Sequence, residues 1–166
     1  MNKIWVTALY LALTLLVKPA LGLAVPFQKG VANTSILLGP SDLVRVSVKT
    51  IELPDGYPYS KAYRWGGDEV SPPKRIIETL EVVRKNHTVR IPLSAFVDLG
   101  NPRIIELVKL PSHGYRLIIR GGDAAGSYTA CLDFRSDEIV QRKVTNSEFP
   151  KEVWEKTVFS FNHLNN

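Results

Sequence analysis

Apolar and polar residues alternate along much of this chain with a period of two. In Val44–Lys49 every second residue is valine and the residues between are Arg, Ser and Lys. In Tyr128–Phe134, Tyr, Ala, Leu and Phe alternate with Thr, Cys and Asp. Because successive side chains of a strand point to opposite faces, this pattern predicts strands with one buried face. Tyr115–Arg120 and Glu138–Thr145 are predicted strands of the same kind.

Turn signals separate several further apolar runs, and each run predicts another short strand. The phase of the alternation changes near Thr50, which predicts a β-bulge there. Asn86, able to adopt the left-handed conformation, is expected in a hairpin turn over Lys85–His87. Ile104–Leu110 is apolar on both faces, which predicts a central strand. The additional strands are expected at residues 35–38, 61–65, 75–84, 88–93, 104–110 and 157–161.

No segment holds a long helical period. Only single helical turns are expected, one starting at Ser94 and one over Pro150–Glu155, where the proline favours a helix start. Short strands joined by turns are typical of antiparallel sheets with one buried face. The sequence therefore predicts an all-β chain, an antiparallel β-sandwich of about eight or nine short strands, with a partly closed β-barrel as the alternative.

The first 24 residues are predicted to be a secretory signal peptide. Lys3 is followed by the apolar run Ile4–Val17, which is too short for a membrane-spanning helix. Small residues allow cleavage after Gly22 or Ala24. Residues 25–166 are expected to form one β-sandwich domain, with an uncleaved membrane anchor as the alternative reading of the leader. Such a protein would be secreted or periplasmic.

The net charge and the cysteine content of the chain limit the classes of partner and of fold that are expected. The formal net charge is +5, and loss of Lys3 and Lys18 with the signal lowers it to +3. The basic residues are spread along the strands, so no nucleic-acid partner is expected. Cys131 is the single cysteine, which leaves the core to form without an internal disulfide and predicts a buried, inert thiol. No cofactor is expected.

Candidate catalytic groups are sparse. His87, His113 and His163 fall in separate predicted turns or in the tail, and no pair of histidines or cysteines has the close spacing typical of a metal site. Asp68, Glu69 and Asp123 could supply paired carboxylates if their two loops lie at one end of the sandwich. A periplasmic hydrolase that uses loop carboxylates is therefore one alternative function.

An aromatic-rich segment favours ligand binding over catalysis. Tyr57 and Tyr59 are two residues apart, as are Tyr63 and Trp65, so each pair shares a face in extended chain. Aromatic rings with polar tips are good binding anchors, and sugar rings stack on them. The competing interpretation is that these rings cover the core or an edge strand.

Two loops share a Gly-Gly-Asp core, one within Arg64–Val70 and one within Arg120–Tyr128. Paired glycines permit positive φ and leave the backbone uncovered. The loops are predicted first as structural turns and second as rims of a ligand surface.

The leading functional prediction is an exported, non-catalytic binding domain for a protein or an envelope glycan. A structural component of an envelope assembly, contributing a strand edge, is a further alternative. The candidate ligand-binding residues are Tyr57, Tyr59, Tyr63, Arg64, Trp65, Asp68 and Asp123. No catalytic or metal-binding residues are predicted.

Overall fold

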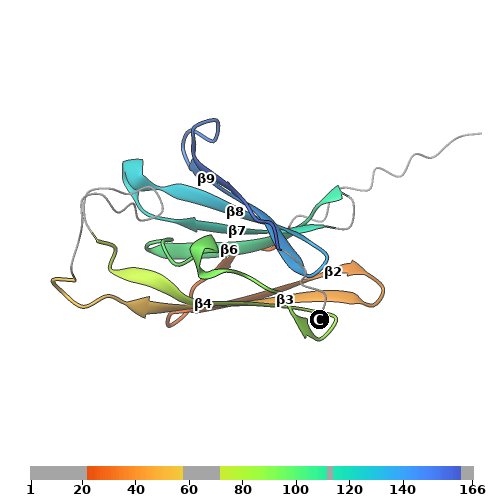
Figure 1. Cartoon of the computed structure of the whole chain (residues 1–166). Helices are drawn as coiled ribbons and strands as arrows, with labels where there is room; N and C mark the ends of the chain where they lie inside the picture. The colour runs from red at the N-terminus through yellow and green to blue at the C-terminus, as the bar shows by residue number, and fades with distance from the viewer. Residues whose placement is uncertain (1–21, 58–71, 112–113, 162–166) are drawn as a thin grey trace, which may run out of the picture.

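Two antiparallel sheets pack face to face. The computed structural model describes residues 22–57, 72–111 and 114–161. Figure 1 shows the two layers, with β6 to β9 in one and β2 to β4 in the other. The sheets do not close into a barrel. The predicted β-sandwich is therefore confirmed, and the barrel alternative is wrong.

The six-stranded sheet has the order β1-β6-β7-β8-β9-β10, and the four-stranded sheet has the order β2-β3-β4-β5. The 3-10 turns η1 (Leu93–Ala95) and η3 (Ala124–Gly126) lie between strands. The strands are β1 (Val25–Pro26), β2 (Val31–Gly39), β3 (Asp42–Glu52), β4 (Arg75–Arg84), β5 (His87–Thr88), β6 (Pro102–Lys109), β7 (Tyr115–Gly121), β8 (Tyr128–Arg135), β9 (Glu138–Asn146) and β10 (Val153–Val158).

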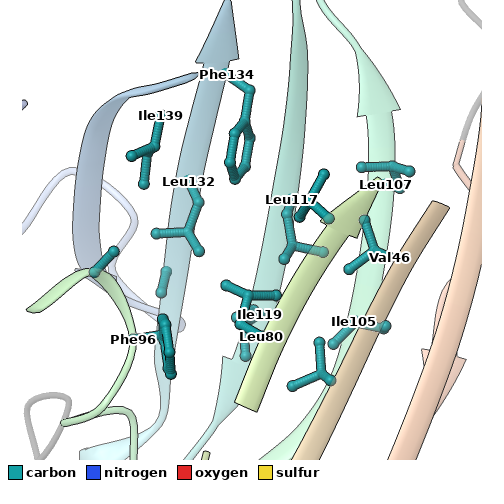
Figure 2. Close-up of a cluster of buried hydrophobic side chains, with 14 of the residues drawn as sticks. Val46, Leu80, Phe96, Ile105, Leu107, Leu117, Ile119, Leu132, Phe134 and Ile139 are labelled. Carbon is teal, nitrogen blue, oxygen red and sulfur yellow. The ribbon is translucent and has the colours of Figure 1, made fainter. Parts of the chain in front are cut away.

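The core lies between the two sheets, as the alternation predicts. The inward side chains of β7 and β8 are almost completely buried, and those of β3 and β4 meet them from the other sheet. Figure 2 shows Leu117 and Ile119 pointing toward Leu80 and Val46 of the facing layer. Burial of this apolar surface is the main force that holds the layers together.

Two local features of the four-stranded sheet match the sequence. The pairing of β3 with β4 shifts between Lys49 and Thr50, so an irregularity lies at the predicted position. The extra residue is Glu78 of β4, however, and β3 keeps its phase, since Thr50 is buried and Ile51 is exposed. Lys85 and Asn86 both have positive φ, 49° and 65°. Two consecutive left-handed residues form the tight hairpin turn that suits the twist of the strands.

The strand predicted at 88–93 is wrong, because β5 has only two residues. After Val89 the chain leaves the sheet and crosses toward the six-stranded one through η1. Leu93, at the end of the predicted strand, is 67% exposed. Because the chain has left the sheet at Leu93, the alternation of a strand no longer determines whether this side chain is buried.

The C-terminal elements also differ from prediction. The expected helical turn at Pro150–Glu155 is wrong, because β10 begins at Val153 and pairs with the free edge of β9. The strand predicted at 157–161 ends at Val158. Trp154 packs against the core, whereas Phe149 is 57% exposed.

The strand β6 does not lie at the centre of its sheet. Its outer neighbour β1 contributes only two residues, Val25 and Pro26. One face of β6 covers the core, and the other carries half-buried side chains. The prediction of a strand over 104–110 is therefore confirmed, but its predicted position at the centre of the sheet is wrong.

A buried ion pair fastens the crossing segment to the six-stranded sheet. Arg142 of β9, 2% exposed, donates to both carboxylate oxygens of Asp98 at 2.6 and 2.5 Å and to the Ser94 carbonyl at 2.8 Å. Glu155 lies 3.2 Å from the same guanidinium. Burial alone would lower the pKa of Arg142, but the hydrogen bond to Asp98 and the nearby negative charges outweigh it and raise the pKa.

A second such pair lies at the end of the sandwich where β3 starts, β4 finishes and β8 turns into β9. Arg84 donates to both oxygens of Asp42, at 2.8 and 2.6 Å, and to the Ser136 carbonyl at 2.8 Å. Its guanidinium also lies over the ring of Tyr115, which stacks on Phe134. The hydrogen bond to Asp42 is the main reason that the pKa of Arg84 is raised. Both ion pairs therefore have a structural role.

Candidate functional site

Several strands start or finish at one end of the sandwich, called here the loop end. β3 finishes there at Glu52, β4 and β6 start there at Arg75 and Pro102, and β7 finishes there at Gly121. Loops that a rigid scaffold gathers in this way are the usual place for binding residues. The loop end is therefore where binding residues are expected.

Asn101 fixes the two sheets to each other at the loop end. It adopts a left-handed conformation with φ of 45°, which asparagine tolerates better than most residues. Its backbone N–H donates to the Arg75 carbonyl at 2.7 Å, and its side-chain oxygen accepts from the Arg75 N–H at 3.2 Å. Its own carbonyl accepts from the Gly122 N–H at 3.2 Å. One residue thus joins the starts of β4 and β6 to the loop after β7.

A cleft of about 480 Å³ opens beside Asn101. A neighbouring hollow of about 410 Å³ shares two residues with it, Glu52 and Arg75, whose side chains form an ion pair at 3.1 Å. Both volumes fall in the range of about 300–1,000 Å³ that is usual for small-ligand sites. The cleft is lined by Glu52, Leu53, Asp55, Lys74, Arg75, Asn101, Pro102 and Arg103, and the hollow adds Phe27, Lys29, Gly30 and Thr50.

Positive charge predominates around the cleft and the hollow. Four basic side chains line them, against the carboxylates of Glu52 and Asp55. Within the described ranges, Lys29, Lys74 and Arg103 form no ion pair with any carboxylate. Since Glu52 is already paired with Arg75, the surface retains uncompensated positive charge that an anionic group of a partner could neutralise.

The structure brings two of the predicted site residues to this same end. Tyr57 follows the turn after β3 and is 38% exposed. Asp123 follows β7 directly and is also exposed. Neither residue lines the cleft. The other candidates, Tyr59, Tyr63, Arg64, Trp65 and Asp68, lie outside the described residues, so their predicted role stays a prediction.

The second Gly-Gly-Asp loop has a clear structural reason for its glycines. Gly122 has φ of +67°, and a Cβ on it would lie 2.2 Å from the Gly126 carbonyl oxygen. A Cβ on Gly121 would lie 2.5 Å from the Tyr128 hydroxyl. The loop then closes on itself, with the Gly126 N–H donating to the Asp123 carbonyl at 2.9 Å. For this loop the structural-turn interpretation is confirmed.

The single cysteine and the possible metal ligands were the remaining reactive groups that the sequence offered. Cys131 is half-buried on β8, and desolvation raises the pKa of its thiol despite the nearby positive charge of Arg116. A thiol of raised pKa carries less thiolate near neutral pH. Across residues 22–57, 72–111 and 114–161, no three or more His, Cys, Asp or Glu side chains gather as a metal site would require.

Nothing within those ranges is a helix with the length and apolar character needed to span a membrane.

Sequence reasoning missed the basic residues of the cleft. Lys74 and Arg75 follow Pro72-Pro73, and Arg103 follows Asn101-Pro102. A basic residue directly after a proline-containing loop was the one available signal. The pattern along the chain gave no reason to place residue 75 beside residue 101, because that neighbourhood depends on how the two sheets stack.

Comparisons with known proteins give no relative. No protein-family model matches the chain, and neither a curated protein nor a solved structure matches it.

Proposed function

We propose that this chain is an exported, non-catalytic binding domain whose partner is a protein or an envelope glycan. The observation that carries the proposal is the open, positively charged cleft at the loop end. Its walls are held by backbone hydrogen bonds of Asn101, so the site is formed before any partner arrives. Preformed sites lose less conformational entropy on binding.

The charge of the cleft favours a partner that carries negative groups. Lys74 and Arg103 flank it from the starts of two strands in different sheets. A guanidinium recognises carboxylates by two parallel hydrogen bonds, while a lysine acts as a point charge. Tyr57 and Asp123 stand at the same end and would meet the outer part of the same partner.

Reversing the charge of the cleft is expected to weaken the binding of polyanions strongly. The variant Lys74→Glu/Arg103→Glu should bind an oligogalacturonate and an oligoglutamate peptide at least about ten-fold more weakly than the parent protein, because two charge-assisted contacts become repulsive. Isothermal titration calorimetry at two salt concentrations measures the loss. Binding by the parent should weaken as salt rises, since these side chains are exposed.

Lys143→Glu/Lys156→Glu is the matched control, because it changes the net charge equally on the outer face of the six-stranded sheet. It should bind as the parent does. Equal loss in both double variants would show that net charge alone matters, and no binding of either probe by the parent would overturn the proposal. Tighter binding of the oligogalacturonate would indicate a glycan partner, and tighter binding of the oligoglutamate peptide would indicate a protein partner.

Export is the other half of the proposal and has its own test. Cleavage after Gly22 or Ala24 would fall directly before β1, so either cut leaves Val25–Pro26 in the mature chain. Mass spectrometry of the protein from its native host should find an N-terminus at Leu23 or Val25. Intact Met1 in a cytoplasmic fraction would contradict export.

A further inference from the structure

A second surface, independent of the loop end, lies on the outer face of the four-stranded sheet. It is a groove of about 420 Å³ that crosses β2, β3 and β4. Two rows of directly paired residues form its floor and sides. They are Asn33, Ser47 and Glu81 in one row and Ser35, Arg45 and Val83 in the next.

The polar side chains of this groove are not used to stabilise the fold. In the described structure neither Arg45 nor Glu81 forms an ion pair, although they are diagonal neighbours on adjacent strands. Elsewhere on the same face a pair does form, since Lys49 Nζ lies 2.6 Å from Glu78. The hydroxyls of Ser35 and Ser47 and the carboxamide of Asn33 likewise make no hydrogen bond to the described residues.

The outer face of the six-stranded sheet provides the contrast. There Arg116 donates to both oxygens of Asp133, at 2.5 and 2.8 Å, and Arg120 donates to Glu106 at 3.0 Å. These pairs satisfy the charges of Arg116 and Arg120 within the protein. The groove instead presents a guanidinium, a carboxylate, a carboxamide and two hydroxyls together, with their hydrogen-bonding capacity available to a ligand.

The balance of charge in the groove indicates the class of ligand. Arg45 and Glu81 carry opposite charges, so an anion would be repelled by one and a cation by the other. A neutral polyhydroxylated molecule avoids this conflict, because each hydroxyl both donates and accepts. Small serines leave room at the centre, and Val83 offers an apolar patch for C–H groups. The volume lies within the range of about 300–1,000 Å³ for small-ligand sites.

We propose that this groove, floored by β2, β3 and β4, binds a neutral saccharide between Arg45 and Glu81. The charged groups hold ring hydroxyls from opposite sides, and Asn33 and the serines complete the hydrogen bonding. The proposal does not depend on the cleft at the loop end, which selects negative charge and uses other residues.

Nuclear magnetic resonance of the isotopically labelled protein tests the groove directly. The probes are short neutral oligosaccharides built from glucose, mannose, galactose or N-acetylglucosamine. At least one of them should shift the amide signals of residues 33–35, 45–47 and 81–83. Arg45→Ala and Glu81→Gln should each weaken that binding about ten-fold or more, since each removes a hydrogen bond to a charged group.

Arg116→Ala is the control, because its guanidinium lies on the other outer face and is already paired with Asp133. It should leave the affinity unchanged, and added salt should also have little effect on a neutral ligand. The proposal is overturned if no probe shifts these amides, if the shifts fall on residues of the loop end, or if the control weakens binding equally. Concentration-dependent shifts of the groove amides without any probe would identify the face as a contact between copies and would overturn it as well.

Discussion

Replacing Arg142 with alanine is expected to lower the free energy of unfolding by about 3–5 kcal/mol. The substitution leaves Asp98 without its bidentate partner and removes the donor to the Ser94 carbonyl. It also empties the volume of a large side chain that is 2% exposed. Denaturation by urea, followed by circular dichroism, measures the change.

The surface pair Arg116–Asp133 serves as the control for this prediction. It has the same bidentate geometry, but Arg116 is 33% exposed and its loss can be compensated by water. Arg116→Ala should therefore cost about 1 kcal/mol or less. Equal costs for the two variants would contradict the assignment of Arg142 as a buried clamp.

A compensating variant separates the charge from the packing. Asp98→Leu/Arg142→Met replaces the buried pair with apolar side chains, and it should be more stable than Arg142→Ala because it leaves no buried charge unpaired. Glu155 also loses its contact with Arg142, but its side chain is 41% exposed and water can solvate it. In Arg142→Ala itself, hydrogen exchange should quicken at the amides of Phe96–Leu99, whose turn the pair holds against β9. Unchanged exchange there would show that the crossing segment is held by other contacts.

Gly122→Ala is expected to destabilise the protein by about 2–4 kcal/mol, the sum of left-handed strain and steric overlap. The residue has φ of +67°, and the new Cβ would lie 2.2 Å from the Gly126 carbonyl oxygen. The carbonyl oxygen and the Cα that carries the new Cβ both belong to the backbone of a tight loop, so the overlap cannot be relieved without opening the loop. Thermal and chemical denaturation measure the loss, and the amide signals of Asp123–Ser127 should shift.

Gly56→Ala is a close control, because Gly56 has φ of +75° but no atom within 4 Å of the position where its Cβ would lie. It should cost about 1 kcal/mol, from backbone strain alone. If both alanine variants lose the same stability, the overlap with Gly126 contributes nothing and the loop has another means of relaxing.

The alternation of side chains predicted the sandwich because it records which face of each strand is buried. The inward sets of β7 and β8 were identified residue by residue, and the position of the irregularity beside Thr50 was also predicted, although its extra residue lies on β4. These features are local, since they depend on pleat and turn chemistry within a few residues.

The predictions were wrong where the chain leaves a sheet or pairs with the free edge of a distant strand. The expected strand to residue 93 is cut short by the crossing to the other sheet, and the expected helical turn at 150–155 is replaced by pairing with β9. Local preference is weak in such segments, and hydrogen bonding to a distant strand decides their conformation.

The sequence by itself determined the class of fold, the buried faces of most strands and the conformation of the tight turns, because these follow from periods and backbone preferences within short segments. Tertiary structure alone decided that Lys74 and Arg103 flank one cleft, that Arg45 and Glu81 share a groove, and that Arg142 meets Asp98. Each of these neighbourhoods joins residues from different strands. Their positions depend on strand order, register and the stacking of two sheets, none of which leaves a signal in the spacing of residues along the chain.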